Sequence, residues 1–309
     1  MLDSIAAILA RPCERSALLT RLLRSARFRG RCRIVSALRR VPLPDELEAL
    51  CGGLRYRLDL RDDVQRSIYF DCYEPRDREF LAALVPPGGV CLDVGANVGF
   101  YSLHFARWVG PSGRVFCFEP DPRNASRLRA NLSLNGYDGV AEVVEAAVAD
   151  REGTATLHRS DAAHSGWGSL AAHASESGTV PVRTTTLDAF LRNRGVAHVD
   201  LIKADVEGAE CELLAGAARS LAEHRFRRLF VEFNGVRLRE RGKTLEDFLG
   251  PLERGGYDPA PEHAELLSKM RRGAIPPHTV WPNLLFVPRE EAPRSAWVTS
   301  RVLCQEEGG

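Results

Sequence analysis

The stretch "CLDVGANVGF", residues 91–100, is the most informative local pattern for the fold. It predicts a buried strand that ends near Asp93, then a glycine-rich turn into a helix over 99–109. A dinucleotide-binding fingerprint needs glycines at positions i, i+2 and i+5, and counted from Gly95 only the first position holds a glycine. A P-loop is excluded as well, because no Gly-Lys-Ser/Thr follows. The turn is therefore glycine-rich without the spacing of a phosphate-binding loop.

Strands and helices alternate around this turn. Further strands are expected at 114–120, 141–148, 198–206, 227–233 and 283–288, and helices at 122–135, 187–194, 208–222 and 244–254. Two more strands, at 153–160 and 179–187, read as a hairpin around the loop 161–178. Repeated strand–helix units predict an α/β fold with a mostly parallel sheet and helices on both faces.

The segment before residue 76 has a different pattern. Residues 1–50 look helical, and "VPLPDELEAL" (41–50) is expected to end in a short helix. "LRYRLDL" (54–60) and "SIYFDCY" (67–73) then read as short strands or a hairpin. We expect residues 1–75 to form a cover or an oligomerisation element, 76–290 to form the main domain, and 291–309 to form a tail.

The composition is that of an ordinary globular protein. Of 309 residues, 44% are hydrophobic and 27% are charged, and the net charge is +1. The sequence contains no run of 18 or more apolar residues, so it predicts no transmembrane segment. The start of the chain is a poor match to a secretory signal. The eight cysteines are scattered without a CxxC pair. We therefore expect neither a disulfide framework nor a zinc site, and a cytoplasmic location.

The first forty residues are basic, with ten arginines against Asp3 and Glu14. One interpretation is an acidic partner such as nucleic acid or an anionic membrane. The other is a solvent-facing helix, and a stripe of leucines at 18, 19, 22 and 23 favours it.

Acidic residues stand at the ends of four expected strands: Asp93, Glu119, Asp205 and Glu232. An open parallel sheet binds its ligand beyond these carboxyl ends. Asp93 would repel a pyrophosphate but attract an ammonium group, and Glu119 can accept hydrogen bonds from both hydroxyls of a ribose. A ligand with an ammonium group, a ribose and no phosphate is S-adenosylmethionine. The alternative is a turn with a purely structural purpose.

Several longer segments resemble the FkbM-type family of S-adenosylmethionine-dependent methyltransferases. The resemblance covers about residues 88–288 and rests on "CLDVGANVGFYSLHFA", "FEPDP", "VVEAAVADREGTATL", "VPVRTTTLDAFL", "VDLIKADVEGAECELLAGA", "LFVEF" and "NLLFVP". It implies a class I, Rossmann-like methyltransferase fold, with a seven-stranded sheet whose last strand is antiparallel. It also implies methyl transfer to a hydroxyl, typically on a sugar, a polyketide or another secondary metabolite.

The same resemblance implies cofactor contacts. The methionine part of the cofactor would be lined by Asp93, Gly95, Asn97 and Gly99. The ribose would be held by Glu119, the adenosine would run along Pro120 and Asp121, and the adenine edge would lie near Ala147. The family motif beside the transferred methyl group corresponds to Asp205, Glu207 and Gly208.

Methyl transfer to an aliphatic hydroxyl requires alignment with the methyl group and removal of a proton. In one arrangement, Asp205, Glu207 or His164 is the general base. In the other, Asp205, Glu232 and Asn234 hold a Mg²⁺ ion that lowers the pKa of the hydroxyl. Both arrangements stay open. In the structural alternative, Glu207 and Glu210 simply favour the N-terminus of helix 208–222 electrostatically, and Glu232 pairs with an arginine.

Two tryptophans are candidates for the walls of the substrate site. Trp167 lies in the loop 161–178, which is long for an α/β connection, and could close over the substrate or simply anchor the loop. Trp281 could form another wall.

We therefore expect an O-methyltransferase that acts on a hydroxylated small molecule, either a glycoside or a polyketide-like compound. One alternative is a nucleic-acid methyltransferase that uses the basic N-terminal segment. It is disfavoured because "ADVEG" stands where amino-methylating enzymes usually carry an NPPY-type motif. A second alternative is a non-catalytic cofactor-binding assembly protein. A homo-oligomer formed through the N-terminal segment is a further expectation.

Overall fold

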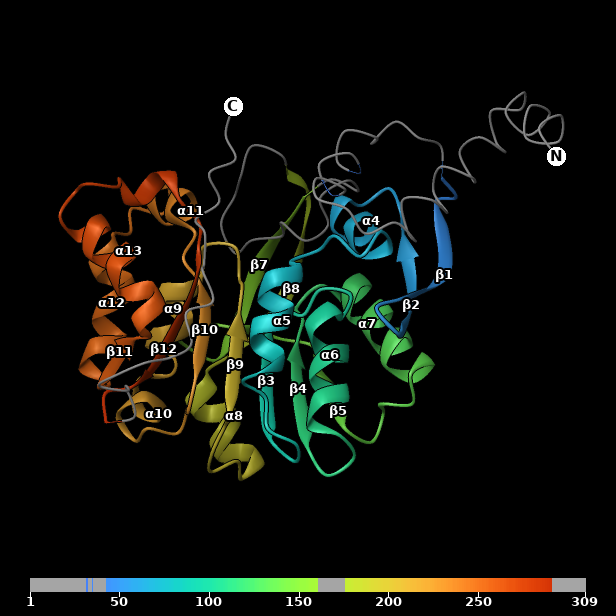
Figure 1. Ribbon diagram of the computed structural model, residues 1–309, viewed down its shortest axis with the longest axis horizontal. Helices are drawn as coiled ribbons and strands as arrows, with labels where there is room; N and C mark the ends of the chain where they lie inside the picture. Colours follow the sequence, from blue (N-terminus) through green and yellow to red (C-terminus); the bar gives the residue numbers. More distant parts are fainter. Residues whose placement is uncertain (1–31, 33–34, 36–42, 161–175, 291–309) are drawn as a thin grey trace, which may run out of the picture.

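The fold is built on a seven-stranded sheet (Figure 1). The computed structural model describes residues 32, 35, 43–160 and 176–290. In sheet order, the strands are β11 (Tyr257–Pro259), β12 (Asn283–Pro288), β10 (Leu229–Glu232), β9 (Leu201–Ala204), β3 (Val90–Val94), β4 (Arg114–Phe118) and β5 (Ala141–Val144). β12 is antiparallel to both of its neighbours, and the strands from β10 to β5 are parallel. The expected class I methyltransferase sheet is confirmed.

The direction of strand order reverses between β3 and β9, because β4 and β5 follow on one side of β3 while β9 and β10 follow on the other. Such a switch point leaves a crevice beyond the strand ends. The register there pairs Asp93 with Lys203 and Val94 with Ala204. Asp205, the next residue after Ala204, therefore lies directly beside the glycine-rich turn.

Helices cover both faces of the sheet. They are α6 (Phe100–Val109), α7 (Pro122–Leu134), α8 (Leu187–Arg194), α9 (Glu210–Ala215), α10 (Ala218–Ala222), α11 (Gly235–Glu240), α12 (Leu245–Arg254), α13 (Pro261–Arg271) and the short 3-10 helix η2 (Pro277–Thr279). Leu92 and Val94 of β3 face the core under α8, α9 and α12, while Cys91 faces the core under α6. The expected helix 208–222 is two helices, because the chain breaks where the carbonyl of Ala149 packs against Gly216.

The segment before the sheet differs from the expectation in two places. Residues Glu46–Cys51 form strand β1 rather than a short helix, and β1 pairs antiparallel with β2 (Leu54–Asp59). The stretch 67–73 forms no strand: residues 67–69 are the end of helix α4 (Asp63–Tyr69), and residues 70–74 connect it to α5 (Pro75–Ala82). Pairing with β2 overrides the helix propensity of "ELEAL", since packing outweighs local preference in short segments.

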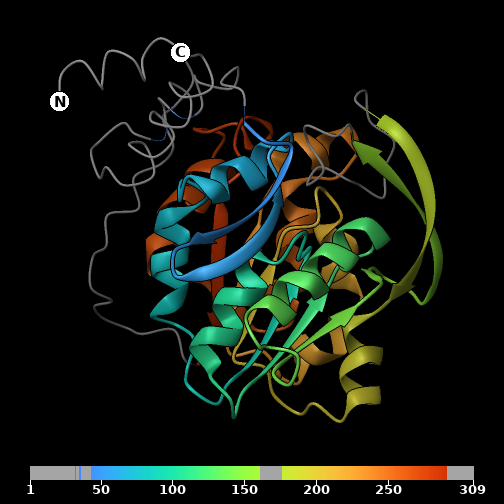
Figure 2. The same cartoon turned by 90° about the vertical axis from the view of Figure 1, so that its right-hand side faces the viewer.

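The expected strand 141–148 divides between two sheets. Its first half is β5, and its second half is β6 (Ala147–Val148), which pairs with β8 (Glu176–Thr185). β8 is antiparallel to β7 (Gly153–Ser160), as expected of this hairpin. Figure 2 shows the hairpin at the periphery of the molecule.

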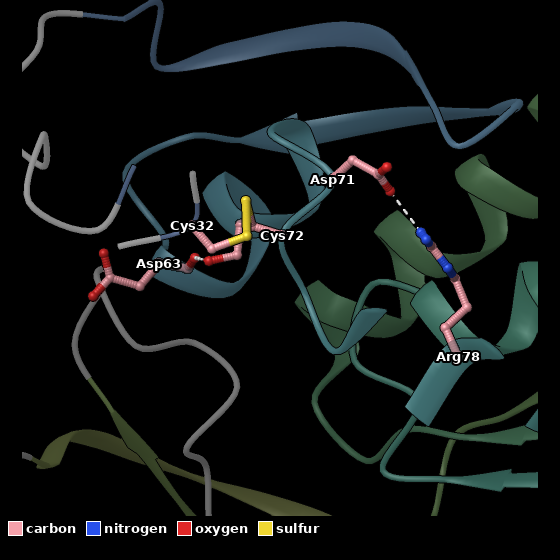
Figure 3. The surroundings of a disulfide bond; sticks show 6 residues. Cys32, Asp63, Asp71, Cys72 and Arg78 are labelled. Carbon is pink, nitrogen blue, oxygen red and sulfur yellow. Dashed lines mark hydrogen bonds and ion pairs between the residues drawn. A yellow bond between two sulfur atoms is a disulfide. The ribbon is translucent and has the colours of Figure 1, made fainter. Parts of the chain in front are cut away.

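A disulfide joins Cys32 to Cys72, just after α4 (Figure 3). The scattered cysteines predicted no disulfide framework, whereas one disulfide is present among the described residues. The adjacent Asp71 forms an ion pair with Arg78 of α5, with 2.5 Å between the charged atoms. The free cysteines among the described residues, Cys51, Cys91, Cys117 and Cys211, are all buried. A cytoplasmic location stays a prediction. The disulfide argues against it, because disulfides are rare in that compartment.

Within the described ranges, no helix is long and apolar enough to cross a membrane.

Candidate functional site

A cavity of about 590 Å³ lies at the carboxyl ends of β3, β4 and β9. The segments 93–98, 118–121 and 203–207, which follow these strands, form much of its lining. Further lining residues come from the segment 64–77, from α6, α7, β6, β7 and α11, from the end of β10, and from the start of β12 with Trp281 before it. The cavity therefore occupies the switch point of the sheet.

The turn after β3 is held close to the end of β9. Gly95 has φ +83°, and a Cβ atom there would lie 1.8 Å from the carbonyl oxygen of Asp205. Gly95 and Asn97 line the cavity. Gly99 does not: a Cβ atom there would lie 2.5 Å from Leu128 of α7, so this glycine lets α6 and α7 pack closely.

Asp93 and Asn97 present unsatisfied acceptor atoms. Asp93 is 1% exposed, and its Oδ2 accepts a 2.6 Å hydrogen bond from Ser102. Its Oδ1, like the Oδ1 of Asn97, is buried without a hydrogen-bond partner in the described part of the chain. Burial raises the pKa of Asp93, against the effect of Lys203. Because buried acceptors without donors are costly, a ligand with an ammonium group fits this position.

Glu119 connects β4 to the glycine-rich turn. Its carboxylate accepts hydrogen bonds from the backbone N–H groups of Asn97 and Asp121, both at 2.8 Å. Burial raises the pKa of Glu119 to about 7, although these two hydrogen bonds oppose the shift. A carboxylate has about four acceptor positions. Glu119 therefore keeps the capacity to accept two hydroxyl groups of a ribose.

Asp121 has a structural role within the cavity wall. It caps α7 by accepting from the N–H of Arg123 at 2.9 Å, and it accepts two 2.7 Å hydrogen bonds from Arg159 of β7. Burial raises its pKa, but the bonds from Arg159 and Arg123 more than offset this, so its pKa lies below the ordinary value. Pro120 and Ala147 line the cavity beside it.

Lys203 is a buried cation that sequence reasoning missed. It is 3% exposed, and its Nζ lies 3.0 Å from Asp205 and 5.0 Å from the centre of the Tyr101 ring. Burial lowers the pKa of Lys203, but the neighbouring carboxylates outweigh burial and raise it. The lysine inside the apolar "LIKAD" run is the signal that could have revealed it, because a charge on a buried strand requires a partner.

Glu207, Glu232 and Asn234 line the same cavity as Asp205. Burial and repulsion from Asp205 raise the pKa values of both glutamates. Asn234 caps α11: its Oδ1 accepts from the N–H of Arg237 at 3.2 Å.

The expected magnesium site finds no support. Asp205 is paired with Lys203, and the oxygen of Asn234 is used as a helix cap. Within the described ranges, no group of three or more His, Cys, Asp or Glu residues is arranged to hold a metal ion.

The segment before the sheet contributes residues that sequence reasoning missed. Tyr73, Glu74 and Asp77 line the cavity. Tyr101 donates a 2.5 Å hydrogen bond from its hydroxyl to Glu74, and Asn283 donates a 2.7 Å bond to Asp77. No motif marks these positions, because they meet the site only through folding.

The tryptophan and histidine candidates have different outcomes. Trp281 lines the cavity and is 54% exposed. His164 and Trp167 lie outside the described residues.

Comparisons with known proteins agree with this geometry. The model of the methyltransferase FkbM domain matches residues 93–273. The 2-O-methyltransferase NoeI of Sinorhizobium fredii is 34% identical over 189 residues, which span 57% of this chain and 75% of that protein. The 31-O-demethyl-FK506 methyltransferase FkbM of Streptomyces tacrolimicus is 32% identical over 182 residues, 50% of this chain and 67% of that protein.

A solved structure, fibrillarin of Aeropyrum pernix with natively bound S-adenosyl-L-methionine, aligns with a TM-score of 0.39 and 15% identity. The alignment covers 80% of this chain and 84% of that chain.

Proposed function

Because the chain belongs to the methyltransferase FkbM domain family, we propose that it transfers a methyl group from S-adenosylmethionine to a hydroxyl of a sugar or a secondary metabolite. The family and the seven-stranded sheet make it an S-adenosylmethionine-dependent methyltransferase. The hydroxyl acceptor is the finer part of the proposal. The observation that carries the proposed cofactor binding is the set of buried, unpartnered hydrogen-bond acceptor atoms at the switch point of the sheet.

The residues present fit this cofactor. The unpartnered oxygens of Asp93 and Asn97 suit its ammonium group, and the remaining capacity of Glu119 suits the two ribose hydroxyls. Pro120 and Ala147 offer apolar surface for the adenine. When bound, the cofactor supplies an electrophilic methyl group on a sulfonium and a neutral thioether as leaving group.

The acceptor assignment is supported by the relatives. The names of two of them specify O-methylation. A third relative, from Haloferax volcanii, is a hexuronic acid methyltransferase that is 27% identical over 159 residues, 51% of this chain and 62% of that protein. The exposed Trp281 at the cavity offers a large apolar face with a polar N–H to such a molecule.

The proposal is tested by cofactor binding and methyl transfer. We expect the protein to bind S-adenosylmethionine in calorimetry and to transfer a radiolabelled methyl group to a member of a panel of glycosides and hydroxylated polyketides. Glu119→Ala should weaken cofactor binding at least about tenfold, or about 1.4 kcal/mol.

Glu145→Ala is the matched control, since Glu145 follows β5 as Glu119 follows β4 but is exposed and pairs with Arg129. It should bind the cofactor like the wild type. Equal binding by both variants, or label found only on amines, would contradict the proposal.

A further inference from the structure

We propose that Glu74 is the general base of methyl transfer and takes the proton from the acceptor hydroxyl. This inference rests on the proposed function and deepens it. Glu74 lies outside the region 93–273 that the family model matches. The base would therefore come from the segment before the family domain.

The backbone at Glu74 directs its side chain into the cavity. Glu74 is the N-cap of α5, in a left-handed conformation with φ 39° and ψ 52°. An acid at an N-cap normally accepts from its own helix, but Glu74 makes no such bond. Its Oε2 instead accepts from the hydroxyl of Tyr101. A non-glycine residue in the left-handed conformation is strained, and such residues cluster at functional sites.

Contacts connect Glu74 to the strand ends that surround the methionine side of the proposed cofactor. Tyr101 donates a hydrogen bond from its hydroxyl to Glu74. The Nζ atom of Lys203 lies 5.0 Å from the centre of the Tyr101 ring. Lys203 in turn pairs with Asp205, whose carbonyl packs against Gly95. All five of these residues line the same cavity.

Most other carboxylates of the cavity are already engaged. Asp205 is paired with Lys203, Asp121 with Arg159, and Asp77 with Asn283. Glu119 holds two backbone N–H groups. In contrast, the Oε1 atom of Glu74 accepts a hydrogen bond from none of the described residues. It is therefore available to a hydroxyl of the substrate.

The chemical step balances with Glu74 as the base. The bond between the acceptor oxygen and the methyl carbon forms as the bond between sulfur and that carbon breaks. The electron pair of the broken bond goes to sulfur, which changes from a sulfonium to a thioether. The proton of the hydroxyl moves to Oε1 of Glu74 and is later released to water.

The surroundings keep Glu74 basic at neutral pH. Burial raises its pKa to about 7; Lys203 lowers it, Asp205 raises it, the bond from Tyr101 lowers it and Asp77 raises it. Tyr73, beside it in the chain, is a further titratable group that interacts with Glu74. The base is lost by protonation below this pKa. The turnover rate should therefore fall about tenfold for each pH unit below about 7.

The experiment uses the full chain and the acceptor found in the transfer panel. Glu74→Gln should lower kcat about 100-fold or more and remove the acidic limb of the pH profile, because general-base catalysis contributes about 10²–10⁴-fold. Its dissociation constant for S-adenosylmethionine should stay within about threefold of the wild type, since Glu74 does not touch the proposed cofactor contacts. Glu79→Gln is the matched control, an exposed glutamate on the same helix, and should behave as the wild type.

Tyr101→Phe gives a second reading if Glu74→Gln does not fold. The bond from Tyr101 lowers the pKa of Glu74, so its removal should move the acidic limb to higher pH. An unmoved limb would overturn the proposal. So would a Glu74→Gln variant with wild-type kcat, a loss of activity in Glu207→Gln or Glu232→Gln instead, or a rate that EDTA abolishes. The two failures are distinguishable. If the wild type transfers no methyl group, the proposed function fails; if the wild type is active but Glu74→Gln is unaffected, only the assignment of the base fails.

Discussion

At the scale of single residues, the site depends on a close approach of two backbones. The turn after β3 and the end of β9 meet where Gly95 contacts the carbonyl of Asp205. This contact places Asp93, Asn97 and Asp205 around one cavity. A side chain at position 95 would push these groups apart.

We expect Gly95→Ala to destabilise the protein and abolish cofactor binding. The added Cβ would lie 1.8 Å from a backbone oxygen, so the strand ends must move. Gly136→Ala is the control, because Gly136 also has a positive φ, of +70°, but nothing lies within 4 Å of its Cβ position. Conformation alone should cost Gly136→Ala about 1–2 kcal/mol. Urea unfolding and calorimetry measure both effects; equal losses in the two variants would show that the close approach is unimportant.

At the scale of elements, two asparagines attach the β1–β2 hairpin to the domain: Asn131 of α7 and Asn135, which caps the C-terminal end of that helix. Asn131 accepts from the N–H of Arg57 at 2.7 Å and donates to the carbonyl of Val98 at 2.8 Å. Asn135 accepts from the N–H of Arg55 and donates to the carbonyl of the same residue. These side chains complete the free edge of β2. The sequence does not predict this docking, because it joins residues more than 70 positions apart.

We expect Asn131→Ala to cost about 1–3 kcal/mol, the penalty for leaving buried polar groups without partners. Asn131 is 0% exposed, and its loss strands the N–H of Arg57 and the carbonyl of Val98. Asn135→Ala breaks the same kind of bond where water replaces it, so its cost should stay below about 1 kcal/mol. Urea unfolding measures the loss of stability in each variant, and hydrogen exchange at the Arg57 amide measures how well that N–H group stays protected. Faster exchange in Asn135→Ala than in Asn131→Ala would contradict this view.

At the scale of the whole molecule, the segment before the sheet shares a core with the methyltransferase domain. Leu54, Tyr56 and Leu58 of β2 belong to the same buried cluster as Phe105 of α6 and Val115 of β4. The cavity likewise takes residues from both parts. We therefore predict that residues 43–288 unfold as one cooperative unit.

Leu58→Ala should destabilise this unit by about 2–5 kcal/mol, the usual cost of truncating a buried leucine. Leu50→Ala, in the paired strand of the same hairpin, is the control, because Leu50 is 62% exposed and should cost about 0.5 kcal/mol or less. Calorimetry should show a single transition in both variants, lowered only for Leu58→Ala. Two separated transitions would mean that the hairpin and the domain unfold independently.

Local sequence patterns predict the parallel sheet and the acidic residues at its strand ends. Apolar strand runs, helix caps such as Thr244 and the spacing of the glycine-rich turn are local patterns, and local physics decides them. Asp93, Glu119 and Asp205 were found in this way, because a strand end is visible in the sequence.

The tertiary structure determines which partners these acids and Glu74 have. Glu74 meets Tyr101 across 27 residues, and Asp121 meets Arg159 across 38, so no local pattern contains either contact. The same is true of the disulfide between Cys32 and Cys72 and of the strand at 46–51, which exists because β2 lies beside it. Local sequence specifies where a group enters the fold, while its partner, and with it its charge state and chemistry, depends on residues that only folding brings near.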